Sequence, residues 1–335
     1  MKKILLSGLL FGLSTSIGFA ACDARNLVAE LKQNEPATYE ALQREAAQYA
    51  NPEGVFWEVS HEALSHTSYV FGTLHKADPR ILDLPSNVRA ALEGADVVAV
   101  EIENADDPSA VGAVIGKRPQ LLLQPQGETL ADDLSPDTIA SIDAYLNGLG
   151  MDFDTINPLQ PWIGATTLSF TQCDMEWGGP GAQVLDTSLI ALAKSKDIPV
   201  VSLETIESQL EAIAAINEAM FIRSIENVAQ LYDEGIYDAV LQTMNELYLS
   251  EQIGMIIPVQ LHYTGKYDGF DDDWAAFQEA LLDARNDLMV ENAARLMDEQ
   301  STFLAVGALH LIGETGLVEG LRNDGFAVKR VPLER

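Results

Sequence analysis

The chain has 335 residues, of which 47% are hydrophobic, and its 51 acidic and 20 basic side chains give a formal net charge of −31. This apolar content is enough for a large folded core and excludes global disorder. Such an excess of negative charge repels nucleic acid and anionic membrane surfaces, so we expect no nucleic-acid partner.

The N-terminus has the composition of an export signal. Lys2 and Lys3 precede an apolar run that contains Gly and Ser and ends in the small residues Ala20 and Ala21, as in secretory signal peptides. This run is too short for a stable membrane span. We therefore expect residues 1–21 to be removed, which leaves an exported domain over residues 22–335, periplasmic or secreted.

The two cysteines, Cys22 and Cys173, favour a disulfide bond if the protein is exported. Phe19 to Cys22 resembles a lipobox, so a lipid anchor on Cys22 is the alternative. Lipoboxes carry an aliphatic residue where this chain has Phe19, and we favour the disulfide for that reason. Mass spectrometry of the non-reduced protein distinguishes the two, because an anchored Cys22 carries a diacylglycerol adduct.

The first strand signal in the mature chain is the alternating run 55–59, and the next is the apolar run 68–71. The β-branched and aromatic residues in these runs predict two strands joined as a hairpin. Gly72 follows the second run, and His75 comes three positions after it. This strand should therefore end in a side chain that can bind a metal.

A helix over residues 88–93 and a strand over residues 96–103 come next. The strand is apolar nearly throughout, which predicts burial on both faces. It ends with Glu101 and Glu103, and we expect both carboxylates on one face because strand side chains repeat every second residue. We also expect this strand to lie beside the strand that precedes His75.

Residues 105–300 contain mostly helical patterns broken by Pro and Gly, which predicts a large helical insertion. One further strand, over residues 198–204, interrupts them and ends in Glu204. A late helical stretch carries Arg285 and Asn286. Ligands of open α/β sheets bind at the carboxyl ends of strands, so Glu204 is a candidate site residue.

The pattern of strand and Gly-x-x-His then occurs a second time. The apolar run 302–306 is followed by Gly307 and His310, and a helix over 316–322 and a strand over 326–331 end the chain. The sequence thus predicts an α/β fold, with a mixed central sheet built from two βαβ-like Gly-x-x-His halves.

Two of the five histidines occupy equivalent places in these two units. His75, His310 and Glu101 supply the three His and Glu ligands typical of a catalytic divalent-metal site with one position left for water. Ligand type alone does not choose between Mn, Co, Zn and Fe. We therefore expect a divalent metal of one of these four kinds.

Other side chains near these strand ends complete a hydrolytic site. Glu103 or Glu204 can act as a general base, and Arg285 can stabilise an oxyanion. A single Gly-x-x-His is a weak signal, since most such histidines are hydrogen-bonded core or loop residues. Two copies, each closing an apolar strand, favour the shared site.

These segments resemble the TraB/GumN family, which is related to the TIKI proteases. The motifs that match are, in order, Phe71-Gly72-Thr73-Leu74-His75, Val100-Glu101, Leu185-Asp186, Leu203-Glu204-Thr205 with Gln209, Arg285-Asn286 and Val306-Gly307-Ala308-Leu309-His310. The resemblance implies a metal-dependent hydrolase, peptidase-like, and we expect its substrate to be a peptide or another small amide or ester. Arg285 and Asn286 match a family pair, and we place both in the catalytic group with Glu101, Glu103 and Glu204.

Some relatives of this family bind haem. The alternative interpretation is therefore a non-catalytic periplasmic protein that binds haem or a metal through the same histidines.

Overall fold

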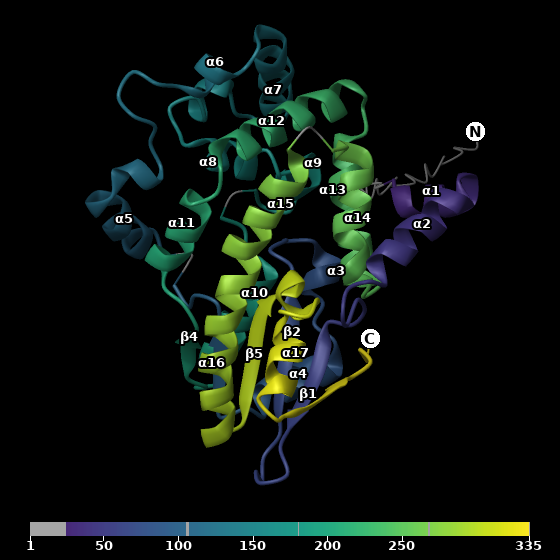
Figure 1. The fold of residues 1–335 in the computed structure, drawn as a ribbon. Coiled ribbons are helices and arrows are strands. Elements are labelled where there is room, and N and C mark those ends of the chain that lie inside the picture. The colour runs from purple at the N-terminus through teal and green to yellow at the C-terminus, as the bar shows by residue number, and fades with distance from the viewer. Residues whose placement is uncertain (1–24, 105–106, 180, 267–268, 335) are drawn as a thin grey trace, which may run out of the picture.

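The computed structural model describes residues 25–104, 107–179, 181–266 and 269–334 (Figure 1). The expected signal peptide and Cys22 lie outside the described residues. Export, cleavage after residue 21 and the disulfide to Cys173 therefore stay predictions.

Six strands of the described chain form one mixed sheet in the order β4-β3-β5-β2-β1-β6. The strands are β1 Phe56–Ser60, β2 Ser68–Thr73, β3 Val97–Val100, β4 Val200–Ser202, β5 Thr302–Gly307 and β6 Ala327–Arg330. β1 is antiparallel to both of its neighbours, β2 and β6, whereas β2, β5, β3 and β4 pair in parallel. The predicted α/β fold with a mixed sheet is confirmed.

β5 lies between β2 and β3 and pairs with both of them in parallel. The two Gly-x-x-His units are therefore interleaved rather than side by side, and the expectation that β3 lies directly beside β2 is wrong. All four residues of β3 and the first five of β5 are buried, as is usual for central parallel strands covered on both faces. This order brings the ends of three strands, which precede His75, Glu101 and His310, to one edge of the sheet.

Many helices surround the sheet. Those before β4 are α1 Leu27–Asn34, α2 Pro36–Ala46, α3 Pro79–Leu82, α4 Ser86–Glu93, α5 Pro108–Lys117, α6 Leu130–Asp133, α7 Pro136–Gly148, α8 Pro161–Thr167, α9 Gln172–Glu176 and α10 Leu185–Ser195. Those after β4 are α11 Ile206–Ala214, α12 Glu218–Asp233, α13 Tyr237–Leu249, α14 Ile256–Thr264, α15 Phe270–Gln278, α16 Ala284–Glu299 and α17 Leu317–Asn323. Short 3₁₀ segments are η1 Pro119–Leu121, η2 Phe153–Thr155, η3 Ile253–Met255 and η5 Ala308–Leu311, and η4 Glu279–Asp283 is a π-helix.

Among the helices between β3 and β5, α6, α7, α8, α9 and α12 lie beyond one end of the sheet, whereas α10 and α16 pack beside the strands (Figure 1). Buried apolar residues accordingly gather in two clusters. One surrounds the sheet and includes Val70, Val98 and Leu304, and the other joins α7 and α12 through residues such as Leu146 and Ile225. The assignment of residues 22–335 to a single domain stays a prediction. No helix in the described ranges is long and apolar enough to cross a membrane.

Gly72 of β2 has no room for a side chain. A Cβ there would lie 2.7 Å from Leu311 Cδ1 and 3.0 Å from Ala308 Cα. We expect Gly72→Ala to destabilise the protein by about 1–3 kcal/mol, because the strand and η5 would have to separate. The free energy of unfolding in urea measures this.

Gly116→Ala is the matched control, since a Cβ at Gly116 in α5 meets nothing within 4 Å. Alanine has the better helix propensity, so this change should be neutral or slightly stabilising. Equal effects of the two substitutions would contradict the close packing of β2 on η5.

Candidate functional site

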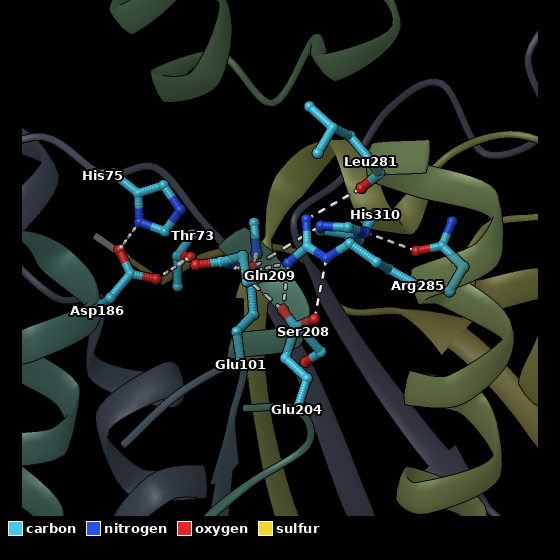
Figure 2. Close-up of polar contacts among 12 residues, drawn as sticks. Thr73, His75, Glu101, Asp186, Glu204, Ser208, Gln209, Leu281, Arg285 and His310 are labelled. Atoms are coloured by element: carbon cyan, nitrogen blue, oxygen red, sulfur yellow. Dashed lines mark hydrogen bonds and ion pairs between the residues drawn. The ribbon is translucent and has the colours of Figure 1, made fainter. Parts of the chain in front are cut away.

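His75 follows the end of β2 and is held by Asp186, from the first turn of α10 (Figure 2). His75 Nδ1 lies 2.7 Å from Asp186 Oδ2, and Thr73 Oγ1 donates to Asp186 Oδ1 at 2.5 Å. Because a carboxylate accepts, Nδ1 is the donor, and Nε2 faces away from Asp186. The His75 side chain is 64% exposed.

The Asp186 carboxylate also raises the pKa of His75. Water around the exposed ring weakens this attraction without changing its sign. The metal-free imidazole should therefore be positively charged at neutral pH.

His310 lies in η5, just after β5, and its side chain is only 6% exposed. His310 Nδ1 lies 2.6 Å from the Oδ1 of Asn286, a buried residue of α16. Burial lowers the pKa of His310 to about 4, so the ring is neutral at pH 7. With Nδ1–H donating to an amide oxygen, Nε2 keeps its lone pair. This Nε2 lies 3.9 Å from Glu101 Oε1.

Glu101 joins the ends of β3 and β5. Its Oε1 accepts a hydrogen bond from Gly307 N at 2.7 Å, and its Oε2 accepts one from Arg285 Nη2 at 2.7 Å. Burial by itself would raise the pKa of Glu101, but His310, His75 and Arg285 together outweigh it and lower that pKa. Glu101 is therefore ionised at neutral pH.

Arg285 binds two carboxylates at once. Besides Glu101, it contacts Glu204 through Nε at 3.1 Å and again through Nη2. Gln209 Nε2 lies 3.3 Å from both Glu101 Oε2 and Glu204 Oε1, which ties the same two carboxylates together. The Arg285 side chain is 12% exposed and that of Glu204 is 2% exposed. This network of four residues is thus largely removed from solvent.

The backbone before Arg285 departs from a regular α-helix. The π-helix η4 immediately precedes α16, and Arg285 Nη1 donates to Leu281 O within it at 3.0 Å. Such π-helical turns occur frequently at functional sites. Here the wider turn supplies one more acceptor for the guanidinium.

Most of the predicted site residues come together. His75, Glu101, Glu204, Arg285 and His310 belong to one group, with the His75–Asp186 pair on one side and His310 and Arg285 on the other (Figure 2). The two histidines are close enough for the charge of His75 to lower the pKa of His310. Asn286 joins the group through its hydrogen bond to His310.

Glu103 is the exception among the predicted residues. β3 ends at Val100, so the two-residue alternation that we expected to place Glu103 on the same face as Glu101 does not continue. The Glu103 backbone N–H donates to Ser202 Oγ at 2.9 Å, and no hydrogen bond between described residues uses the Glu103 carboxylate. A catalytic role for Glu103 stays a prediction.

Asp186, Thr73 and Gln209 were not predicted as site residues. All three lie within the motifs that carry the family resemblance, but their residue types gave no separate signal. Asp186 does stand at the start of a helix after a Gly-rich loop, where a carboxylate commonly serves only the helix terminus. Its partner, His75, lies 111 positions away in the sequence.

The donor chemistry of the group fits a divalent cation in part. Both histidines are held through Nδ1 by an oxygen acceptor, which is the usual arrangement around metal-binding imidazoles. Glu101, however, is already bound by Arg285 and by the N–H of Gly307. In the portion of the chain that the structure describes, no group of three or more His, Cys, Asp or Glu side chains is placed to hold a metal ion. The role of Glu101 as third ligand therefore stays a prediction.

We expect Asp186→Asn to lower the pKa of His75 in the metal-free protein by on the order of one unit, because the attracting negative charge is lost. The imidazole proton signals in an NMR pH titration measure this. Asp197→Asn, at an exposed position after α10, is the control and should leave the His75 titration unchanged. An unchanged titration in Asp186→Asn would contradict the pairing.

Known proteins that are similar to this chain include metalloproteases and an uncharacterized bacterial protein. Zebrafish metalloprotease TIKI1 is 25% identical over 311 residues, covering 79% of this chain and 61% of that protein, and human metalloprotease TIKI1 is 21% identical over 320 residues, covering 80% and 60%. The chain thus spans about three fifths of the length of these relatives. The uncharacterized protein YbaP of Escherichia coli is 24% identical over 261 residues, covering 76% of this chain and 87% of that protein.

No solved structure matches this chain. The model of the TraB/PrgY/gumN family matches residues 55–330, a range that begins just before β1 and ends with β6. The predicted resemblance is confirmed, and the chain belongs to the TraB/PrgY/gumN family.

Proposed function

We propose that this protein is a metal-dependent hydrolase of peptidase type, with His75, His310 and Glu101 as the metal-binding group. The observation that carries this proposal is the matched pair of imidazoles. Each follows a Gly-x-x-His strand, each is held through Nδ1, and each has its Nε2 free of any protein hydrogen bond among the described residues. The metalloprotease relatives support the same activity.

A divalent metal bound there would supply an activated water and polarise the substrate carbonyl. The chain's own residues orient the group. Asp186 and Asn286 fix the two imidazole rings. Arg285 holds the carboxylates of Glu101 and Glu204 in place, and Glu204 is the carboxylate we assign to proton transfer.

Metal analysis and a peptide-cleavage screen on the same preparation test the proposal. After chelation and reloading with Mn, Co, Zn or Fe, we expect about one metal per chain and cleavage that depends on it. The variants His75→Ala and His310→Ala should lose both metal and cleavage. His262→Ala is the control for these two variants, because His262 lies exposed on α14. Wild-type protein that takes up none of the four metals and cleaves no peptide would overturn the proposal.

The alternative, a non-catalytic binding protein for haem or a metal, stays a prediction. It requires a haem absorption band on adding haemin that is lost in His75→Ala. We also propose export of the protein, on the strength of residues 1–21.

A further inference from the structure

A pocket of about 360 Å³ opens beside His75 and Glu101. Asp186, Thr187 and Gln209 complete its polar lining. Most of the remaining wall is apolar and comes from the carboxyl end of β3, the Gly-rich loop before α10 and the first turns of α10. These apolar lining residues are Val100, Ile102, Ala182, Val184 and Ile190.

The charged groups of the pocket already have partners inside the protein. Asp186 bonds to Thr73 and His75, and Glu101 bonds to Gly307 N and to Arg285. Apart from a metal ion held by His75 and Glu101, the pocket therefore has no unpaired charge to offer to a charged ligand group. Burying an unpaired charge in it would be costly, whereas burying an apolar side chain is favourable.

One polar group of the pocket remains suited to a peptide backbone. Gln209 directs its Nε2 at two carboxylates, which fixes the orientation of the amide. None of the hydrogen bonds among the described residues uses Gln209 Oε1. This oxygen is an acceptor that a substrate N–H can reach.

We propose that this pocket is the subsite for an uncharged, apolar side chain of the substrate, next to the bond that is cut. The proposal rests on the proposed hydrolase function. The volume of the pocket lies near the lower end of the range of small-molecule sites, about 300–1,000 Å³. That size suits one branched or aromatic side chain with its adjoining backbone.

The test is equilibrium binding, which does not require hydrolysis. Ligand-observed NMR titrations of the full-length protein would use the N-acetyl amides of leucine, phenylalanine, aspartate and lysine. We expect the leucine and phenylalanine amides to bind at least about tenfold more tightly than the two charged ones. Equal or tighter binding of a charged amide would overturn the proposal.

Two substitutions locate the binding. Ala182→Phe fills the pocket and should weaken leucine amide binding about tenfold, and Ala191→Phe, at an exposed position of the same α10, should not. Val184→Asp places a charge in the wall at the N-cap of α10, where aspartate is favoured, so this variant is expected to fold and to bind more weakly. Unchanged binding in folded Ala182→Phe or Val184→Asp would contradict the assignment.

The two proposals can fail separately. Apolar binding without any cleavage would remove the hydrolase function and keep the subsite. Cleavage without a preference for apolar side chains, with unchanged binding in the variants, would remove the subsite and keep the hydrolase function.

Discussion

Replacing His310 by alanine is expected to lower metal-dependent hydrolysis by on the order of 10³-fold, and the same is expected for His75→Ala. Each substitution removes one of the two imidazoles that the structure prepares, and metal stabilisation of a transition state amounts to several kcal/mol. The uptake of metal should fall in parallel. Both quantities are measured on protein that has been chelated and then reloaded.

His262→Ala tests whether the loss of hydrolysis is specific to His310 and His75 or follows the removal of any histidine. The His262 side chain is exposed on α14, so activity and metal content should stay at wild-type levels. Circular dichroism checks that His310→Ala still folds, because His310 is buried against Asn286. Full metal content and activity in a folded His310→Ala protein would rule out the imidazole pair as the site.

Replacing Arg285 by methionine is expected to destabilise the protein by about 3–5 kcal/mol, the usual effect of removing one partner of a buried ion pair. Glu101 and Glu204 would then lie close together without a cation between them. Both side chains are largely buried, so water cannot replace the lost guanidinium. Urea unfolding of the metal-free protein measures the change. A loss below about 1 kcal/mol would show that the network is effectively solvated.

A combined variant identifies the cause. Adding Glu101→Gln and Glu204→Gln to Arg285→Met removes the uncompensated charges, so much of the lost stability should return. Arg118→Met is the matched control, since Arg118 also pairs with two glutamates, Glu207 and Glu211, but all three are far more exposed. Its effect should stay below about 1 kcal/mol.

The strands near the site could be predicted because their signals are local. The runs around Val70, Val98 and Leu304 are continuous apolar stretches bounded by turn residues, and each is a buried strand. The order of the strands could not be derived in the same way. β5 pairs with both β2 and β3, and this depends on contacts between residues more than 200 positions apart, such as Gly72 with Val306.

The candidate site likewise contains residues that a local pattern reveals and residues whose role depends on distant contacts. His75 and His310 stood out because two strands end in the same motif. Asp186 did not stand out, because its role depends on His75, which the sequence places far from it. Glu103 was predicted from strand alternation, but β3 ends at Val100.

The interleaved sheet also has a consequence for how the protein is made. Residues 302–307 form β5, the strand between β2 and β3. Until these residues have been synthesised, β2 and β3 lack their shared neighbour and Glu101 has no Gly307 N–H to bind. Pairings this distant in the chain form late and slowly. A ribosome-bound or partly translocated chain would therefore be inactive, and two co-expressed fragments split just before β5 should regain activity only by assembling with each other.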